Sequence, residues 1–185
     1  AAENIYEKSV NLIAENNYIF TTEENKNNAD NSIGVNIAGS SVKAEATSGN
    51  NIIGVSSSSS EKSANQDLFN EGLVMSGGTA EFTAASANLV RAYQNGIHIK
   101  SGDNNVTLQG AYNEVSVNSG NAIVTDAGSV SNITITSTAE NGINSIISYG
   151  EDGKGIYTEE DSSGEIYIQG KGEIGVLNLC RRYSY

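Results

Sequence analysis

The sequence predicts an all-β fold, a parallel β-helix in which three short strands make up each rung of a solenoid. The first observation is that short segments rich in Ile and Val recur in groups of three along most of the chain. Each group spans about 20–30 residues, which is a typical period for stacked repeat proteins. The second observation is that Gly and Asn punctuate these segments, while the 185 residues include 20 Gly and no Pro. Both features favour a repeating β structure.

Aligning the groups gives three columns of expected strands. The first column is Ile33–Val35, Leu73–Met75, Ile97–Ile99, Ile123–Val124 and Ile156–Tyr157. The second column is Val10–Leu12, Val42–Ala44, Ala80–Phe82, Val106–Leu108, Ile133–Ile135 and Ile166–Ile168. The third column is Tyr18–Phe20, Ile52–Ile53, Leu89–Val90, Val115–Val117, Ile143 and Ile174–Val176. The leading rung lacks a first strand in this alignment.

Each expected strand buries its flanking apolar residues and turns its middle residue outward, because successive side chains alternate in direction. Parallel stacking of about six rungs would bury a continuous apolar column, and stability would grow with each neighbour. Parallel crossovers are usually right-handed, so we expect a right-handed helix. The chain is expected to be a single solenoid segment over 1–185, with repeats over 8–178 and an atypical tail over 179–185.

Asn and Gly mark the entries to the expected strands, as in Asn95-Gly96 and Asn141-Gly142. Both residue types tolerate the left-handed backbone angles of tight corners. Asn side chains at equivalent corners, such as Asn51, Asn88 and Asn113, are candidates for hydrogen-bonded ladders. The alternative is that Asn-Gly forms hairpin turns, but the connections recur in threes rather than in pairs.

The spacing between strands varies mainly from the third strand to the next first strand, so insertions are expected along one edge of the rod. The inserted loops would be 21–31, 56–71 and 148–154. They supply the candidate partner-binding residues Glu23, Glu24, Asn25, Ser56, Ser60, Asp67, Phe69, Glu71, Glu151 and Asp152. Passive loops are the alternative, since solenoids tolerate insertions. In a rival register Ile52 and Ile143 are first strands, which would remove some of the apparent insertions.

The composition excludes several classes of function. Ten Lys and Arg against 22 Asp and Glu give a net charge of -12, which disfavours nucleic-acid binding and anionic membrane surfaces. No apolar run approaches the ~20 residues of a membrane-spanning helix, so this segment is not expected to insert into a membrane. A single cysteine, Cys180, excludes an intrachain disulfide.

The sequence contains no recognisable catalytic, metal or cofactor motif, so we expect neither an enzyme nor a bound cofactor. His98 is the only histidine, and its outward position predicts an exposed surface residue. The acidic run Glu159–Asp161 lacks the spacing of a calcium loop. Hydrolases of polysaccharides need two carboxylates across the sugar, and no such pair is evident in this sequence.

The segments Asn95–Val117 and Asn121–Ile146, with a weaker echo in 155–176, resemble the passenger regions of bacterial autotransporters. The resemblance covers about 8–178 and implies a right-handed parallel β-helix that is secreted and displayed on the outer membrane of a Gram-negative cell. It also implies roles in adhesion, self-association or virulence. The tail Cys180–Tyr185 departs from the pattern, and the membrane β-barrel of such proteins is not in this chain.

We therefore expect a non-enzymatic extracellular solenoid whose edge loops bind a host or bacterial surface glycan or protein, or a second copy of the chain. The alternative is a β-helix that binds or degrades polysaccharides as a lyase or hydrolase. A third possibility is a purely structural stalk.

Overall fold

The computed structural model describes residues 3–6, 9–19, 32–54 and 69–179, and these residues form strands and their connections with no helix. The strands are β1 (Glu3–Tyr6), β2 (Ser9–Ala14), β3 (Asn17–Ile19), β4 (Ile33–Ala46), β5 (Asn51–Ile53), β6 (Phe69–Ala84), β7 (Ala87–Gly110), β8 (Tyr112–Val117), β9 (Ile123–Thr125), β10 (Val130–Ser137), β11 (Ile143–Ser148), β12 (Ile156–Thr158), β13 (Ser163–Gln169) and β14 (Ile174–Asn178). All the strand pairings are parallel. The fold is therefore a parallel β-solenoid, as the sequence predicts.

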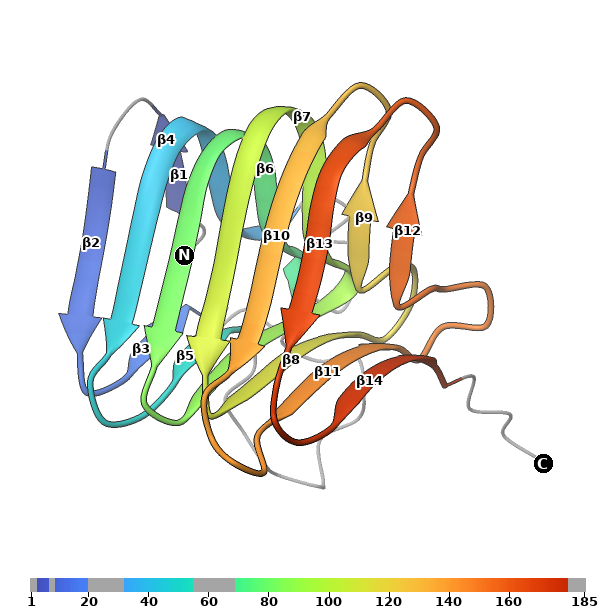
Figure 1. The fold of residues 1–185 in the computed structure, drawn as a ribbon. Coiled ribbons are helices and arrows are strands. Elements are labelled where there is room, and N and C mark those ends of the chain that lie inside the picture. The colour runs from blue at the N-terminus through green and yellow to red at the C-terminus, as the bar shows by residue number, and fades with distance from the viewer. Residues whose placement is uncertain (1–2, 7–8, 20–31, 55–68, 180–185) are drawn as a thin grey trace.

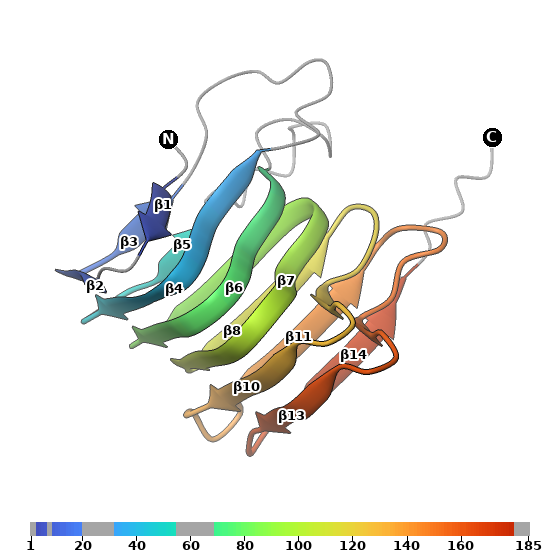
Figure 2. The same cartoon turned by 90° about the horizontal axis from the view of Figure 1, so that it is seen from above.

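The strands form six rungs with three faces. Strands β4, β6 and β7 are long because they continue around corners and contribute to more than one face. Figure 1 looks onto the second face, where β2, β4, β6, β7, β10 and β13 lie side by side. Figure 2 shows the rungs following one another from β1–β3 at one end to β12–β14 at the other.

The register confirms the second-face column in full, since Val10, Val42, Ala80, Val106, Ile133 and Ile166 pair in succession. On the third face Ile52 pairs with Leu89. The rival register is therefore wrong, because it makes Ile52 a first strand.

Parts of the first and third columns differ from the expected alignment. Val35, not Ile33, pairs with Leu73, because Gly34 occupies the crowded corner position that Gly72 takes in the next rung. On the third face Val90, not Leu89, pairs with Val115. In the following rungs Ile146, not Ile143, and Val176, not Ile174, continue this column. The first rung also has a first strand, β1, which pairs with β4. The alignment of apolar segments misses this strand because its sequence is largely polar. The handedness stays a prediction.

Glycine in the Asn-Gly-Ile motif provides space rather than an unusual backbone angle. Gly96 does not have a positive φ. A Cβ at Gly96 would lie 2.5 Å from Val115 Cγ1 and 2.6 Å from the Ala122 carbonyl oxygen. The chain enters the first face so close to the next rung that only the smallest residues fit, and Ala122 takes the same place in the following rung.

The interior combines apolar columns with a ladder of buried asparagines. On the first face Leu73, Ile97 and Ile123 are stacked and fully buried. At the corner between the second and third faces, four hydrogen bonds of 2.8–2.9 Å run from the Nδ2 of one asparagine to the Oδ1 of the next, in the order Asn17, Asn51, Asn88, Asn113 and Asn144. The ladder satisfies amide groups that would be costly to bury unpaired, and it confirms the expected stacking of Asn side chains.

Candidate functional site: the insertion corner and the adjoining ion-pair cluster

The longest connections all join a third strand to the next first strand. They run from Ile19 to Ile33, from Ile53 to Phe69 and from Ser148 to Ile156. By contrast, Val117 and Ile123 bound a short connection at the same corner, and β7 passes this corner without a break. The insertions therefore occur along one edge of the solenoid, as the spacing of the sequence predicts. We call this edge the insertion corner.

The second insertion leaves and rejoins the stack at almost the same point. Ile53 pairs with Val90 and Phe69 pairs with Ala92, so only the position of Arg91 separates the two ends of the insertion. Gly54 lies at that position, because a Cβ built on it would meet the Arg91 carbonyl oxygen. The segment 55–68 is therefore an addition to a rung that is already complete without it.

The candidate partner-binding residues fall into three groups. Glu23, Glu24, Asn25, Ser56, Ser60 and Asp67 lie outside the described residues. Glu151 and Asp152 are exposed in the connection between β11 and β12. Phe69 is 2% exposed and belongs to the hydrophobic core, and Glu71 is held by neighbouring side chains. Partner binding by this set stays a prediction, with Phe69 and Glu71 serving the scaffold.

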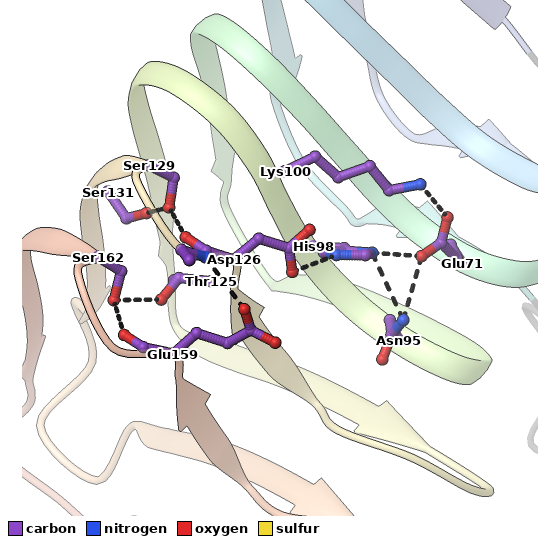
Figure 3. Close-up of polar contacts among 11 residues, drawn as sticks. Glu71, Asn95, His98, Lys100, Thr125, Asp126, Ser129, Ser131, Glu159 and Ser162 are labelled. Atoms are coloured by element: carbon purple, nitrogen blue, oxygen red, sulfur yellow. Dashed lines mark hydrogen bonds and ion pairs between the residues drawn. The ribbon is translucent and has the colours of Figure 1, made fainter.

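Glu71 begins an ion-pair cluster that runs from the insertion corner across the first face (Figure 3). One oxygen, Oε1, contacts His98 Nδ1 and accepts a hydrogen bond from Asn95 Nδ2 at 3.1 Å. The other, Oε2, lies 3.1 Å from Lys100 Nζ. On the far side of the imidazole, His98 Nε2 lies 2.9 Å from Asp126 Oδ1. The cluster thus alternates acid, base and acid across three successive rungs.

The charges in this cluster reinforce one another. Burial alone would raise the pKa of Glu71, but hydrogen bonds from His98, Asn95 and Lys100 outweigh it and lower the pKa to about 2. Burial alone would lower the pKa of His98, but Glu71 and Asp126 raise it above the usual value. Both ring nitrogens face carboxylate oxygens, which accept but do not donate hydrogen bonds, so the doubly protonated imidazolium fits the site.

His98 therefore differs from the exposed residue that the sequence suggests, because 14% of its side chain is exposed and both nitrogens are engaged. A general base needs a ring nitrogen within reach of a substrate proton. Here the two carboxylates occupy both nitrogens, so the arrangement favours an electrostatic clamp between rungs over acid–base catalysis.

Hydroxyl groups extend the cluster toward the last rung. Ser129 Oγ donates to the Asp126 carbonyl oxygen at 2.7 Å. Glu159 Oε2 accepts from the Ala127 backbone amide at 3.2 Å, and Thr125 Oγ1 donates to Ser162 Oγ at 3.3 Å. The first contact lies within the fifth rung, and the other two connect the fifth and sixth rungs where the first face meets the second (Figure 3).

A second ion pair lies on the outside of the third face. Arg91 Nε and Nη2 contact the two carboxylate oxygens of Glu114 at 2.7 and 3.1 Å. Tyr112 Oη and Ser116 Oγ each donate to the same carboxylate at 2.7 Å. Burial, which raises the pKa of Glu114, is outweighed chiefly by the hydrogen bond and charge of Arg91, so the pKa is lowered.

An open cavity of about 500 Å³ adjoins this ion pair at the corner between the second and third faces. It is lined by Ser86, Ala111, Tyr112 and residues 139–143. Burial and the hydrogen bond to Glu114 raise the pKa of the Tyr112 hydroxyl. The hydroxyl therefore stays protonated, and its hydrogen bond holds the ring in place. Tyr112, Glu140 and Asn141 are thus neighbours in the lining of the cavity.

Sequence reasoning missed both ion pairs. Glu71, His98 and Asp126 lie 27 and 28 residues apart in the chain, which is close to one rung. A search for opposite charges one rung apart would find the pairs, but Glu71 and Asp126 stand at corners, outside the aligned strand triplets. In the part of the chain that the structure describes, no three His, Cys, Asp or Glu residues gather to hold a metal ion.

Comparisons with known proteins identify no relative, since no family model, no curated protein and no solved structure matches this chain. Among the described residues, no helix has the length and apolar character needed to cross a membrane.

Proposed function

We propose that this chain is a non-enzymatic, extracellular solenoid that binds partners through the segments inserted at its insertion corner. The observation that carries the proposal is the register at the second insertion, where Gly54 and Phe69 bound a segment that the rung does not need. Segments that add nothing to a scaffold and collect along one edge are suited to contact with a partner. Adhesion and self-association are the two functions that such an edge serves.

The acidic surface and the resemblance to autotransporter passenger regions support display at a bacterial cell surface, with a surface glycan, a surface protein or a second copy as the partner. The pairing of both nitrogens of His98 with carboxylates supports a role without catalysis. The ion pairs hold neighbouring rungs together, which supports a structural role for these charged residues.

A deletion of residues 55–68 that joins Gly54 directly to Phe69 tests the proposal. This junction restores the local connection of the next rung, where Arg91 and Ala92 are consecutive. It also keeps Phe69 and Glu71, which the scaffold needs. The variant should keep the β circular dichroism spectrum and thermal unfolding of the wild type. A second variant with residues 55–68 in scrambled order controls for length and composition.

Binding is measured by clumping of beads coated with the chain at low salt, where the net charge of -12 opposes end-to-end stacking of copies, and by retention on arrays of bacterial and host-cell surface glycans and proteins. We expect the wild type to bind at least one probe, and both variants to lose at least about ten-fold of that binding. A folded deletion variant that binds as well as the wild type would contradict the proposal.

A second candidate function, carbohydrate binding, is favoured by the cavity beside Tyr112. An aromatic ring offers a flat apolar surface, and neighbouring carboxylate and amide groups accept and donate hydrogen bonds, which is the pattern of a small-molecule site. Glu140 and Asn141 line the same cavity. Tyr112 is held in place before any ligand arrives, which reduces the entropic cost of binding.

The double variant Glu140→Gln, Asn141→Ala tests this second function on a glycan array. Binding that the double variant weakens about ten-fold, and that the deletion of 55–68 leaves intact, would assign the ligand to the cavity. Incubation with polysaccharides, followed by assay for new reducing or unsaturated ends, decides whether any bound chain is also cleaved.

A further inference from the structure

The last rung exposes residues at positions that the middle rungs bury. On the third face Val90, Val115, Ile146 and Val176 pair in succession along one column. Val90, Val115 and Ile146 are each 1% exposed, but Val176 is 43% exposed. These residues share one place in their rungs, and among the described strands none stacks on the outer side of β14.

The second face shows the same change at the same end. Ile133 and Ile135 in β10 are each 1% exposed, whereas their partners Ile166 and Ile168 in β13 are only partly buried. Strand β13 pairs with β10 and has no second neighbour among the described strands. Its outer edge therefore presents free backbone groups beside an apolar column, which is a template for another strand.

The first rung exposes apolar residues on its opposite side, which faces away from the second rung. Val10 and Leu12 in β2 are partly buried, while their partners Val42 and Ala44 in β4 are 2% and 1% exposed. Ile19 on the third face is likewise less buried than Ile53, its partner in the second rung. Strand β2 pairs only with β4 in the described part of the chain.

We propose that the first rung of a second copy of this chain stacks on the last rung, so that copies join head to tail. Within one copy the contact between the fifth and sixth rungs consists of three parallel strand pairs, β9 with β12, β10 with β13 and β11 with β14. A second copy offers β1, β2 and β3 in the same arrangement. The joint therefore repeats a contact that the chain already makes between its own rungs.

The side chains match along this joint. The second-face column continues from Ile166 and Ile168 to Val10 and Leu12 of the second copy, and the third-face column continues from Val176 to Ile19. The asparagine ladder does not continue, because Ile174 already occupies its place in the last rung. Apolar stacking and backbone pairing between parallel edges thus hold the joint.

Two different surfaces meet at this joint, so the contact is heterologous and does not close. Copies would form unbranched rods whose length grows with protein concentration. The net charge of -12 opposes this assembly, and salt weakens the repulsion. The proposal goes beyond the proposed function, since no residue of the insertion corner takes part.

The test uses two variants of the whole chain that each block one end. Ile168→Lys places a charge in the open column of the last rung, and Leu12→Lys does so in the first rung. Gln169→Lys and Asn11→Lys add the same charge to the same two strands at exposed outward positions, and they serve as matched controls. Assembly is measured by sedimentation velocity and negative-stain electron microscopy at about 0.5 M salt, where charge repulsion is screened.

We expect the wild type and both controls to form rods, and each blocked variant to remain monomeric. An equal mixture of Ile168→Lys and Leu12→Lys should form dimers and nothing larger, because one intact first rung meets one intact last rung. Dimers in the mixture also show that both variants are folded. The deletion of 55–68 should still form rods, which separates this test from that of the proposed function.

Three results would overturn the proposal. One is a wild type that stays monomeric at the highest soluble concentration. Another is rods of unchanged length from either blocked variant. The last is a mixture of the two blocked variants that stays monomeric although each variant has the circular dichroism spectrum of the wild type.

Discussion

His98 Nε2 lies 2.9 Å from Asp126 Oδ1, and this contact joins the fourth rung to the fifth while Glu71 joins the same imidazole to the third. One side chain thus holds three rungs together on the first face. Because both carboxylates favour the imidazolium form, the strength of the contact depends on pH.

The first prediction is that this cluster stabilises the fold within a limited pH window. The pKa of His98 is raised in the folded state, so its contribution is complete below about pH 6.5 and is lost as the pH rises through the raised value. The pKa of Glu71 is lowered from 4.5 to about 2, so its contribution is complete above about pH 4.5 and is lost as the pH falls toward 2.

His98→Gln should therefore lower the free energy of unfolding by about 1–3 kcal/mol between about pH 4.5 and 6.5. The difference from the wild type should shrink above and below that window. Urea unfolding at a series of pH values measures it. A difference that does not vary with pH would mean that His98 acts through packing alone.

The second prediction concerns the asparagine ladder. Asn88→Ala removes the acceptor for Asn51 and the donor for Asn113 in a fully buried position. Unsatisfied buried amides are costly, so we expect a loss of about 2–4 kcal/mol in the free energy of unfolding. Asn132→Ala breaks an exposed bond between Asn side chains of neighbouring rungs and should cost less than about 0.5 kcal/mol. Similar losses for the two variants would argue against a structural ladder.

The third prediction concerns the crowded corner glycine. Gly96→Ala places a Cβ against Val115 and the Ala122 carbonyl, both well inside normal contact distance. Because backbone atoms cannot move aside cheaply, we expect a loss of at least about 1–3 kcal/mol. Gly175→Ala is the control, since its Cβ would lie 3.6 Å from the nearest atom. Thermal unfolding of the two variants compares them, and equal melting temperatures would show that the corner relaxes.

The fourth prediction separates the two kinds of ion pair. Glu114→Gln leaves the Arg91 guanidinium without its charged partner in a site where 29% of the Arg91 side chain is exposed. We expect a loss of about 1–3 kcal/mol, after allowance for screening by solvent. Glu81→Gln, in the exposed pair with Lys43, should change stability by less than about 0.5 kcal/mol. Denaturant unfolding at low and high salt distinguishes them, because only the exposed pair is strongly screened.

The sequence predicts the second face well because its strands repeat a simple alternation. In Val106–Leu108 and Ile133–Ile135 a polar residue separates two apolar ones, and nothing interrupts the repeat. The first and third faces are harder to align, because corner residues also repeat. Asn144 occupies the ladder position of Asn113, and this buried amide, rather than the nearest Ile, sets the register.

The candidate site is less predictable for a physical reason. The partners of His98 stand at corners, where the alternation of inward and outward residues breaks down and side-chain direction depends on the path of the backbone. Its place in the inserted segment predicts an exposed position for Glu71, yet Glu71 is buried because Lys100 and His98 neutralise its charge. The position of the insertion corner, by contrast, followed from spacing alone.

Gly54 and Phe69 lie level with the consecutive residues Arg91 and Ala92 of the next rung. The sequence of the segment between them is therefore independent of the folding of the solenoid. Any segment that begins and ends at these two residues closes the same short gap, and lengthening a loop costs little additional free energy. Peptides of unrelated sequence can therefore be exchanged at this point without shifting the register of a single rung. New binding segments can therefore be inserted at this corner while the rest of the solenoid stays the same.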